Sequence, residues 1–141
     1  MTHARYLIDT SGLFRILQRE QRLAWGDHLA AGLIAVCPLV ELDFCYSART
    51  LADRLDKVRL LHEVFPWVPM ADAAYQRAEE VQQLLTQHGT HRSAGAVDLL
   101  IAATAERAGL VVLADDRDFR TIAKVTGQPV AGVVGGPGPR G

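Results

Sequence analysis

Short apolar runs alternate along the chain with longer segments in which apolar residues recur at helical spacing. The apolar runs have the length of strands and cover 5–8, 33–37, 67–68, 110–114 and 130–134. Most of them are apolar throughout, which is typical of strands in a parallel sheet that is covered on both faces. The pattern therefore predicts an α/β fold with a central, mostly parallel sheet flanked by helices on both faces.

The segments between these runs predict the helices. We expect helices over 10–18 (continuing or restarting through 22–31), from Pro38 past Glu41, and over 51–65, 73–88, 94–108 and 119–125. In the segment 73–88, four apolar residues with helical spacing are expected to face inward: Ala74, Ala78, Val81 and Leu85.

Composition and length fit one globular domain of 141 residues, with 49% hydrophobic and 22% charged side chains. We expect a single domain over 1–134 and a flexible, Gly/Pro-rich tail over 135–141. No apolar run is long enough for a membrane helix and no signal peptide is evident, so a cytoplasmic protein without membrane contact is expected. The net charge of −1 leaves nucleic-acid binding undecided, because local Arg clusters can still bind phosphate.

Acidic residues follow two of the predicted strands. Asp9 comes directly after the first, and Asp115 and Asp116 come after the run 110–114. Ligands of open α/β sheets bind beyond the carboxyl ends of the strands, so these acids are expected at one edge. Asp9 alone could also be a helix N-cap.

Two more carboxylates lie within apolar stretches. Glu41 stands in PLVELDF, and Asp98 is the only charged residue between Ser93 and Ala105. Burying a carboxylate is costly unless a cation or donors face it. For Asp98 a helix cap or an internal hydrogen-bond acceptor remains an alternative, and for Glu41 a partly exposed helix position; Asp43 is expected to be solvated.

Several acids at one place need positive charge, because like charges raise one another's pKa. A hard divalent cation such as Mg²⁺ or Mn²⁺ meets that need with oxygen ligands. Asp9 is then interpreted as a metal ligand, and Thr10 and Ser11 as providers of the helix cap and of hydrogen bonds around the ligands.

Three other phosphate chemistries fit less well. A haloacid-dehalogenase-type phosphatase needs an Asp where this chain has Ser11, and a phosphoacceptor receiver domain needs a Lys in a place that neither Lys57 nor Lys124 occupies. A glycine-rich phosphate loop that opens a helix is absent from the sequence.

Four motifs in order resemble those of the PIN-domain ribonucleases of the VapC toxin type, from bacterial toxin–antitoxin pairs. The resemblance covers Tyr6 to Pro129 and rests on LIDTSGL, PLVELDF, AVDLLIAATAE and LADDRDFRTIAKVTGQ. It implies a PIN-like fold and an endoribonuclease that depends on Mg²⁺ or Mn²⁺. The catalytic acids that it implies are Asp9, Glu41, Asp98 and Asp116, with Asp9, Asp98 and Asp116 as metal ligands and Asp118 as a further acid near the site. Many relatives carry a His at Ala114 and an aromatic residue near Gly132.

The resemblance also implies partners: an RNA substrate, a VapB-type antitoxin whose C-terminal segment crosses the toxin's groove, and a second copy in a homodimer. Helices 40–48 and 51–65 would offer the groove, although ordinary core packing explains the same apolar residues. RNA phosphates could contact Arg15, Arg19, Arg22 and Arg92, with His91 beside the last; solvated helix and loop positions are the alternative. A catalytically silent PIN-like module that binds RNA or protein remains the alternative function.

Overall fold

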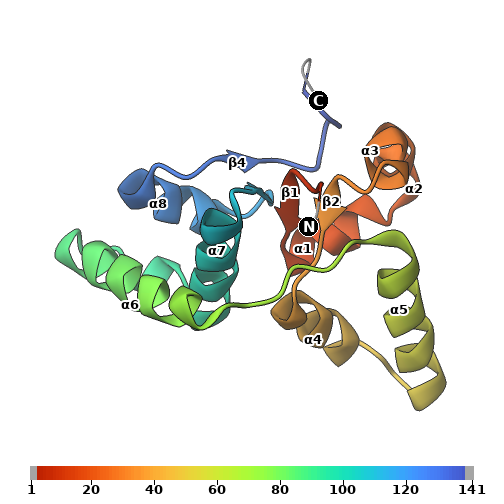
Figure 1. Ribbon diagram of the computed structural model, residues 1–141, viewed down its shortest axis with the longest axis horizontal. Helices are drawn as coiled ribbons and strands as arrows, with labels where there is room; N and C mark the ends of the chain where they lie inside the picture. Colours follow the sequence, from red (N-terminus) through yellow and green to blue (C-terminus); the bar gives the residue numbers. More distant parts are fainter. Residues whose placement is uncertain (1–2, 139–141) are drawn as a thin grey trace.

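A four-stranded parallel sheet lies at the centre of the computed structural model, which describes residues 3–138 (Figure 1). The strand order is β2-β1-β3-β4, and all three pairings are parallel. The strands are β1 (Tyr6–Ile8), β2 (Ile34–Ala35), β3 (Val111–Leu113) and β4 (Val130–Ala131). The predicted parallel sheet is confirmed, although each strand is shorter than its apolar run. The run at 67–68 contributes only a parallel bridge between Trp67 and Val36.

Helices stand on both sides of this sheet, as predicted. They are α1 (Thr10–Ile16), α2 (Arg19–Ala24), α3 (Gly26–Ala30), α4 (Pro38–Tyr46), α5 (Leu51–Val64), α6 (Asp72–Gln87), α7 (Ala96–Ala108) and α8 (Arg117–Thr126), with a 3₁₀ turn η1 at His91–Ser93. In Figure 1, α6, α7 and α8 lie to one side of the strands and α2 to α5 lie to the other.

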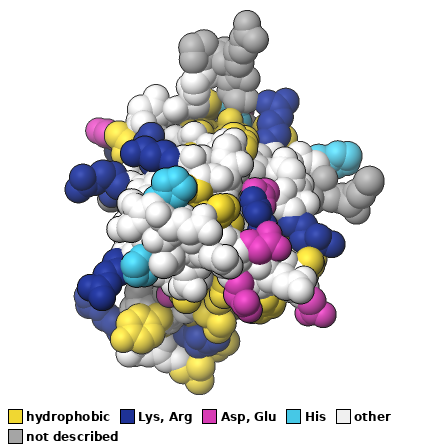
Figure 2. All heavy atoms as spheres, turned by 90° about the vertical axis from the view of Figure 1, so that its left-hand side faces the viewer, with side chains coloured by type: hydrophobic (Ala, Val, Ile, Leu, Met, Phe, Trp, Pro, Cys, Tyr) yellow, Lys and Arg dark blue, Asp and Glu magenta, His cyan; other side chains and the backbone are white. Residues whose placement is uncertain are grey.

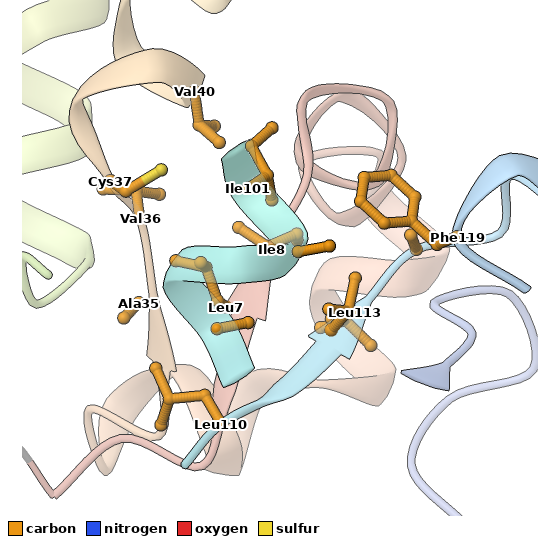
Figure 3. Close-up of a cluster of buried hydrophobic side chains, with 14 of the residues drawn as sticks. Leu7, Ile8, Ala35, Val36, Cys37, Val40, Ile101, Leu110, Leu113 and Phe119 are labelled. Atoms are coloured by element: carbon orange, nitrogen blue, oxygen red, sulfur yellow. The ribbon is translucent and has the colours of Figure 1, made fainter. Parts of the chain in front are cut away.

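The core forms where α7 crosses the strands. Leu7 and Ile8 of β1, Leu113 of β3, Ile101 of α7 and Phe119 of α8 point toward one another and are almost fully buried (Figure 3). The inward stripe predicted for α6 is confirmed, because all four of its members are buried.

The first helical segment departs from a single helix. Gln18 has an extended backbone, with φ −69° and ψ 146°, so α1 ends before it and α2 begins after it. Arg15 therefore lies on one helix, and Arg19 and Arg22 lie on the next.

The apolar stripe of α5 is only half buried. Leu61 and the following Phe65 are buried, whereas Leu51 and Leu55 at the other end are 71% and 52% exposed. This end of α5 thus presents apolar surface to solvent.

The chain after β4 turns back toward α2 and α3. The buried indole of Trp25 donates its N–H to the carbonyl of Val133 at 2.9 Å, and Val133 is itself buried. Of the tail predicted over 135–141, residues 139–141 lie outside the described residues. Within residues 3–138, the helices are too short or too polar to cross a membrane.

Candidate active site

Asp9 is held at the junction between β1 and α1, with only 4% of its surface exposed. Its Oδ1 accepts a hydrogen bond from the backbone N–H of Gly12 at 2.7 Å, and its Oδ2 accepts one from the Ser11 hydroxyl at 2.9 Å. A Cβ at residue 12 would stand 2.7 Å from Asp9 Oδ1 and 2.9 Å from the Leu113 carbonyl, so only glycine fits there. Asp9 is therefore an N-cap whose two oxygens are both oriented by the first turn of α1.

Three other carboxylates gather at the start of two helices. Asp98 lies in the first turn of α7, Asp116 is the N-cap of α8, and Asp118 follows in the first turn of α8. Each offers one carboxylate oxygen, and these three oxygens lie within 4.8 Å of one another. Helix N-termini stabilise negative charge, which partly offsets the repulsion between these carboxylates. Oxygen ligands at this spacing suit a hard divalent cation.

Burial and the neighbouring negative charges raise the pKa values of two acids, Asp98 and Asp9. Burial, followed by the charges of Asp116, Asp118 and Asp9 and a hydrogen bond with Asp118, raises the pKa of Asp98 to about 6. Burial also raises the pKa of Asp9, while the hydrogen bonds from Gly12 and Ser11 lower it. The charge of Asp9 thus acts on Asp98. Asp9 is nevertheless not one of the three acids whose oxygens lie within 4.8 Å of one another, which are Asp98, Asp116 and Asp118. A cation at this place would favour the charged form of Asp98.

Glu41 is oriented by a partner that the sequence analysis missed. Its Oε1 lies 2.8 Å from Nε2 of His62, which comes from α5, 21 residues along the chain. The His62 ring also meets the Trp67 ring edge to face, with 5.7 Å between centroids. No sequence pattern marked His62, because its contact depends on how α5 packs against α4. Glu41 does not belong to the contact group of three acids found among the described residues.

Asp115 contacts different groups from its neighbour Asp116, which belongs to the cluster. Its Oδ1 accepts from Val133 N–H at 3.0 Å, its Oδ2 accepts from Val134 N–H at 3.3 Å, and Arg15 Nη1 lies 3.3 Å from Oδ2. Arg15, one of the arginines considered for RNA, is therefore engaged in an ion pair.

The remaining candidates occupy different surroundings. The Thr10 hydroxyl donates to Oδ2 of Asp43 at 3.0 Å, so it does not orient Asp9 as expected, and Asp43 is exposed but not merely solvated. Arg19 and Arg22 are exposed on α2, and Arg92 is exposed in η1, just before the helix that carries Asp98. Ala114 is fully buried.

A groove lies between α1, α4 and α5, where the sequence predicted one along α4 and α5. The groove has a volume of about 330 Å³. Its lining combines apolar and charged side chains: Phe14, Leu17, Phe44, Asp53, Asp56, Lys57 and Leu60. The Lys57 ammonium stands 5.2 Å from the centroid of the Phe44 ring. Leu42, Tyr46, Leu51 and Leu55 on the same two helices are exposed.

Comparison with known sequences gives one family and close relatives. The PIN domain family matches residues 6–125. The chain is 38% identical over 130 residues to "Ribonuclease VapC21" of Mycobacterium tuberculosis, covering 92% of this chain and 94% of that protein. It is also 38% identical over 130 residues to "Ribonuclease VapC2" of the same species, covering 91% and 92%.

Solved structures with low sequence identity share the fold. The VapBC2 complex of Rickettsia felis, bound to a DNA fragment from its promoter, contains a chain with a TM-score of 0.73 at 14% identity, covering 90% of this chain and 97% of that chain. The DNA-bound VapBC complex of Salmonella typhimurium gives 0.73 at 15% identity, covering 92% and 98%.

Proposed function

Because this chain belongs to the PIN domain family and its VapC-type branch, we infer that it is an endoribonuclease toxin that a protein antitoxin neutralises. The observation that carries this function is the group of carboxylates at the starts of α7 and α8, formed by Asp98, Asp116 and Asp118. Curated relatives that match nearly the whole chain are named ribonucleases, which supports RNA as the substrate.

We propose that Asp98, Asp116 and Asp118 hold a divalent cation, Mg²⁺ or Mn²⁺, with Asp9 beside them. The donor set fits such an ion, because its ligands are carboxylate oxygens close enough to share one centre. When bound, an ion of this kind makes water more acidic and neutralises charge that builds on phosphate oxygens. In the sequence analysis Asp9 was a direct ligand and Asp118 was a further acid near the site. We propose Asp118 as a direct ligand because its carboxylate oxygen lies within 4.8 Å of those of Asp98 and Asp116.

The protein's own residues prepare the site before substrate arrives. Asp9 is fixed by Ser11 and Gly12, and Oδ1 of Asp116 accepts from the N–H of Asp118 at 2.9 Å. Groups that are already oriented do not need to reorganise during the reaction. Glu41, held by His62, is proposed to act at the edge of this site on water or substrate.

RNA is proposed to reach the acids along exposed arginines. Arg92 lies in η1, four residues before the start of α7, and Arg19 and Arg22 lie on α2. Phosphate contacts at such positions can hold an RNA strand without reading its sequence. The face over α6 and α8 shows acidic side chains gathered in one part and Lys and Arg side chains around its margin (Figure 2). Positive charge is therefore distributed in small groups, in keeping with the net charge of −1.

The antitoxin is proposed to dock in the groove between α1, α4 and α5, where apolar side chains and both signs of charge are available. The solved VapBC complexes of the same fold support a VapB-type partner. We further propose a homodimer that acts in the cytoplasm, where an RNA substrate is found.

The direct test is cleavage of single-stranded RNA by the purified chain, with Mn²⁺, with Mg²⁺ and with excess chelator. We expect cleavage with either ion, none with chelator, and none by an Asp98→Asn variant purified in the same way, which controls for contaminating nucleases. RNA binding by wild type without any cleavage would instead support the catalytically silent module.

A further inference from the structure

Asp115 is the acid at this edge of the sheet that the proposed site does not use, and both of its carboxylate oxygens have partners in other parts of the chain. Its carboxylate accepts two hydrogen bonds, from the N–H groups of Val133 and Val134, and forms an ion pair with the guanidinium of Arg15. The two backbone groups belong to the segment after β4, and Arg15 belongs to α1. One side chain therefore ties the turn after β3 to two other parts of the chain.

The segment that receives Asp115 is itself held in place. The carbonyl of Val133 accepts the indole N–H of Trp25 at 2.9 Å, and both residues are buried. The backbone N–H of Ala114 also donates to the carbonyl of Ala131 at 2.8 Å, directly before Asp115. Asp115 thus ties the turn after β3 to the segment after β4, and that segment is in turn held by Trp25.

Gly132 leaves the room that this anchor requires. A Cβ at residue 132 would lie 2.6 Å from Asp115 Oδ1, the oxygen that accepts from Val133. Any larger residue with this backbone would displace the carboxylate.

The turn that Asp115 anchors carries Asp116, the N-cap of α8 and a member of the acidic cluster. Repulsion within the cluster pushes its carboxylates apart, so a restraint on this turn has to come from outside the cluster. Asp115 supplies one, because its hydrogen bonds go to the segment after β4 and its ion pair goes to α1. We propose that Asp115 is a positioning residue that holds Asp116 in the geometry required for the cation.

This inference rests on the proposed function, and two substitutions test it in different ways. Asp115→Asn keeps the size of the side chain but replaces one acceptor oxygen with an NH₂ group that faces donors. Gly132→Ala keeps every polar group and displaces the carboxylate through the added Cβ. Gly26→Ala is the matched control, because nothing lies within 4 Å of a Cβ there.

Each protein is titrated with Mn²⁺ in two assays: RNA cleavage, and thermal unfolding without RNA. We expect Asp115→Asn and Gly132→Ala to need about 10- to 100-fold more Mn²⁺ for half-maximal cleavage, the range found when groups around metal ligands are altered. At saturating Mn²⁺ their kcat should return to within a few-fold of wild type. Their rise in Tm at a fixed, low Mn²⁺ concentration should shrink in parallel, and Gly26→Ala should match wild type in both assays.

The proposal is overturned if folded Asp115→Asn and Gly132→Ala bind Mn²⁺ as wild type does, even when their Tm is lower. It is also overturned if both variants fail to fold, because Asp115 would then be an anchor of the fold as a whole. Failure of the proposed function gives a different result: wild type itself would neither cleave RNA nor respond to Mn²⁺.

Discussion

Asp98 links the acidic cluster to stability, because its pKa in the folded protein is raised from 3.8 to about 6. Between these values the folded state binds more protons than the unfolded state, so the free energy of unfolding falls as pH rises through about 6. We therefore expect metal-free wild type to be less stable at pH 7.5 than at pH 5, and Asp98→Asn to be more stable than wild type at pH 7.5. Allowing for solvent screening, the free energy of unfolding of Asp98→Asn at pH 7.5 should exceed that of wild type by about 1 to 2 kcal/mol.

Urea unfolding in chelator at the two pH values measures this gain. Asp27→Asn, which alters an exposed carboxylate on α3, is the control and should keep the pH dependence of wild type. An Asp98→Asn protein that is no more stable than wild type at pH 7.5 would contradict the account of burial and repulsion at Asp98.

The three acids after β3 are expected to differ in their effect on cleavage. Asp116→Asn should lower activity by about 100-fold or more at any Mn²⁺ concentration, because it changes a proposed ligand. Asp115→Asn should recover at saturating Mn²⁺, whereas Asp118→Asn, which also changes a proposed ligand, should not. Rates are compared at low and at saturating Mn²⁺; if Asp115→Asn is the most damaging under both conditions, the assignment of Asp116 is wrong by one residue.

The positions of these acids follow from local rules, whereas some of their partners do not. Asp9 directly follows β1, and Asp115 and Asp116 lie between β3 and α8, where Asp116 is the N-cap. The contacts of Glu41 with His62 and of Thr10 with Asp43 join residues that are 21 and 33 positions apart. Such pairs depend on the angle and offset between packed helices, which a single sequence does not specify.

Among the helices, α6 was predictable to within a residue or two, because its buried stripe is regular and Gly89 follows it with a φ of +70°. A restart after the first helix was one of two options that the sequence left open, but its place at Gln18 was not predictable, since neither Pro nor Gly stands at Leu17 or Gln18. The stripe of α5 shows another limit: helical spacing identified the helix, but Leu51 and Leu55 of the stripe are exposed and do not face the core.

The contact between α4 and α5 gives a prediction for His62. This side chain is 57% exposed, so His62→Ala should change the free energy of unfolding by less than about 1 kcal/mol. It removes the partner that orients Glu41, and kcat should therefore fall several-fold. Arg59→Ala, which breaks the exposed pair between Arg59 and Asp56 on α5, is the control and should retain full activity. Equal activity in the two variants would show that His62 does not position Glu41.

For the molecule as a whole, alternation of strands and helices was sufficient to predict the parallel sheet and the edge at which the acids gather. The lengths of the strands were not predictable, because only two or three residues of each apolar run pair with a neighbour. The support that the segment after β4 gives to Asp115 was also missed, since it depends on Trp25, 108 residues earlier in the chain.

Binding of a cation should stabilise the whole domain. At 100 times its Kd, an ion that binds only the folded state adds about 2.7 kcal/mol, which corresponds to a rise of several degrees in Tm. We expect this rise with Mg²⁺ or Mn²⁺ for wild type and a smaller one for Asp9→Asn at the same ion concentration. Thermal unfolding measures both, and an equal rise in the two proteins would exclude Asp9 from the site.

The central claim is that acids from α7 and α8 form one cation site at the carboxyl edge of the sheet. An anomalous difference map from crystals of the protein soaked in Mn²⁺ tests it most directly. The account predicts a peak among the carboxylates of Asp98, Asp116 and Asp118, and no peak in crystals of Asp98→Asn soaked in the same way. A peak elsewhere in wild type, or an unchanged peak in Asp98→Asn, would contradict it.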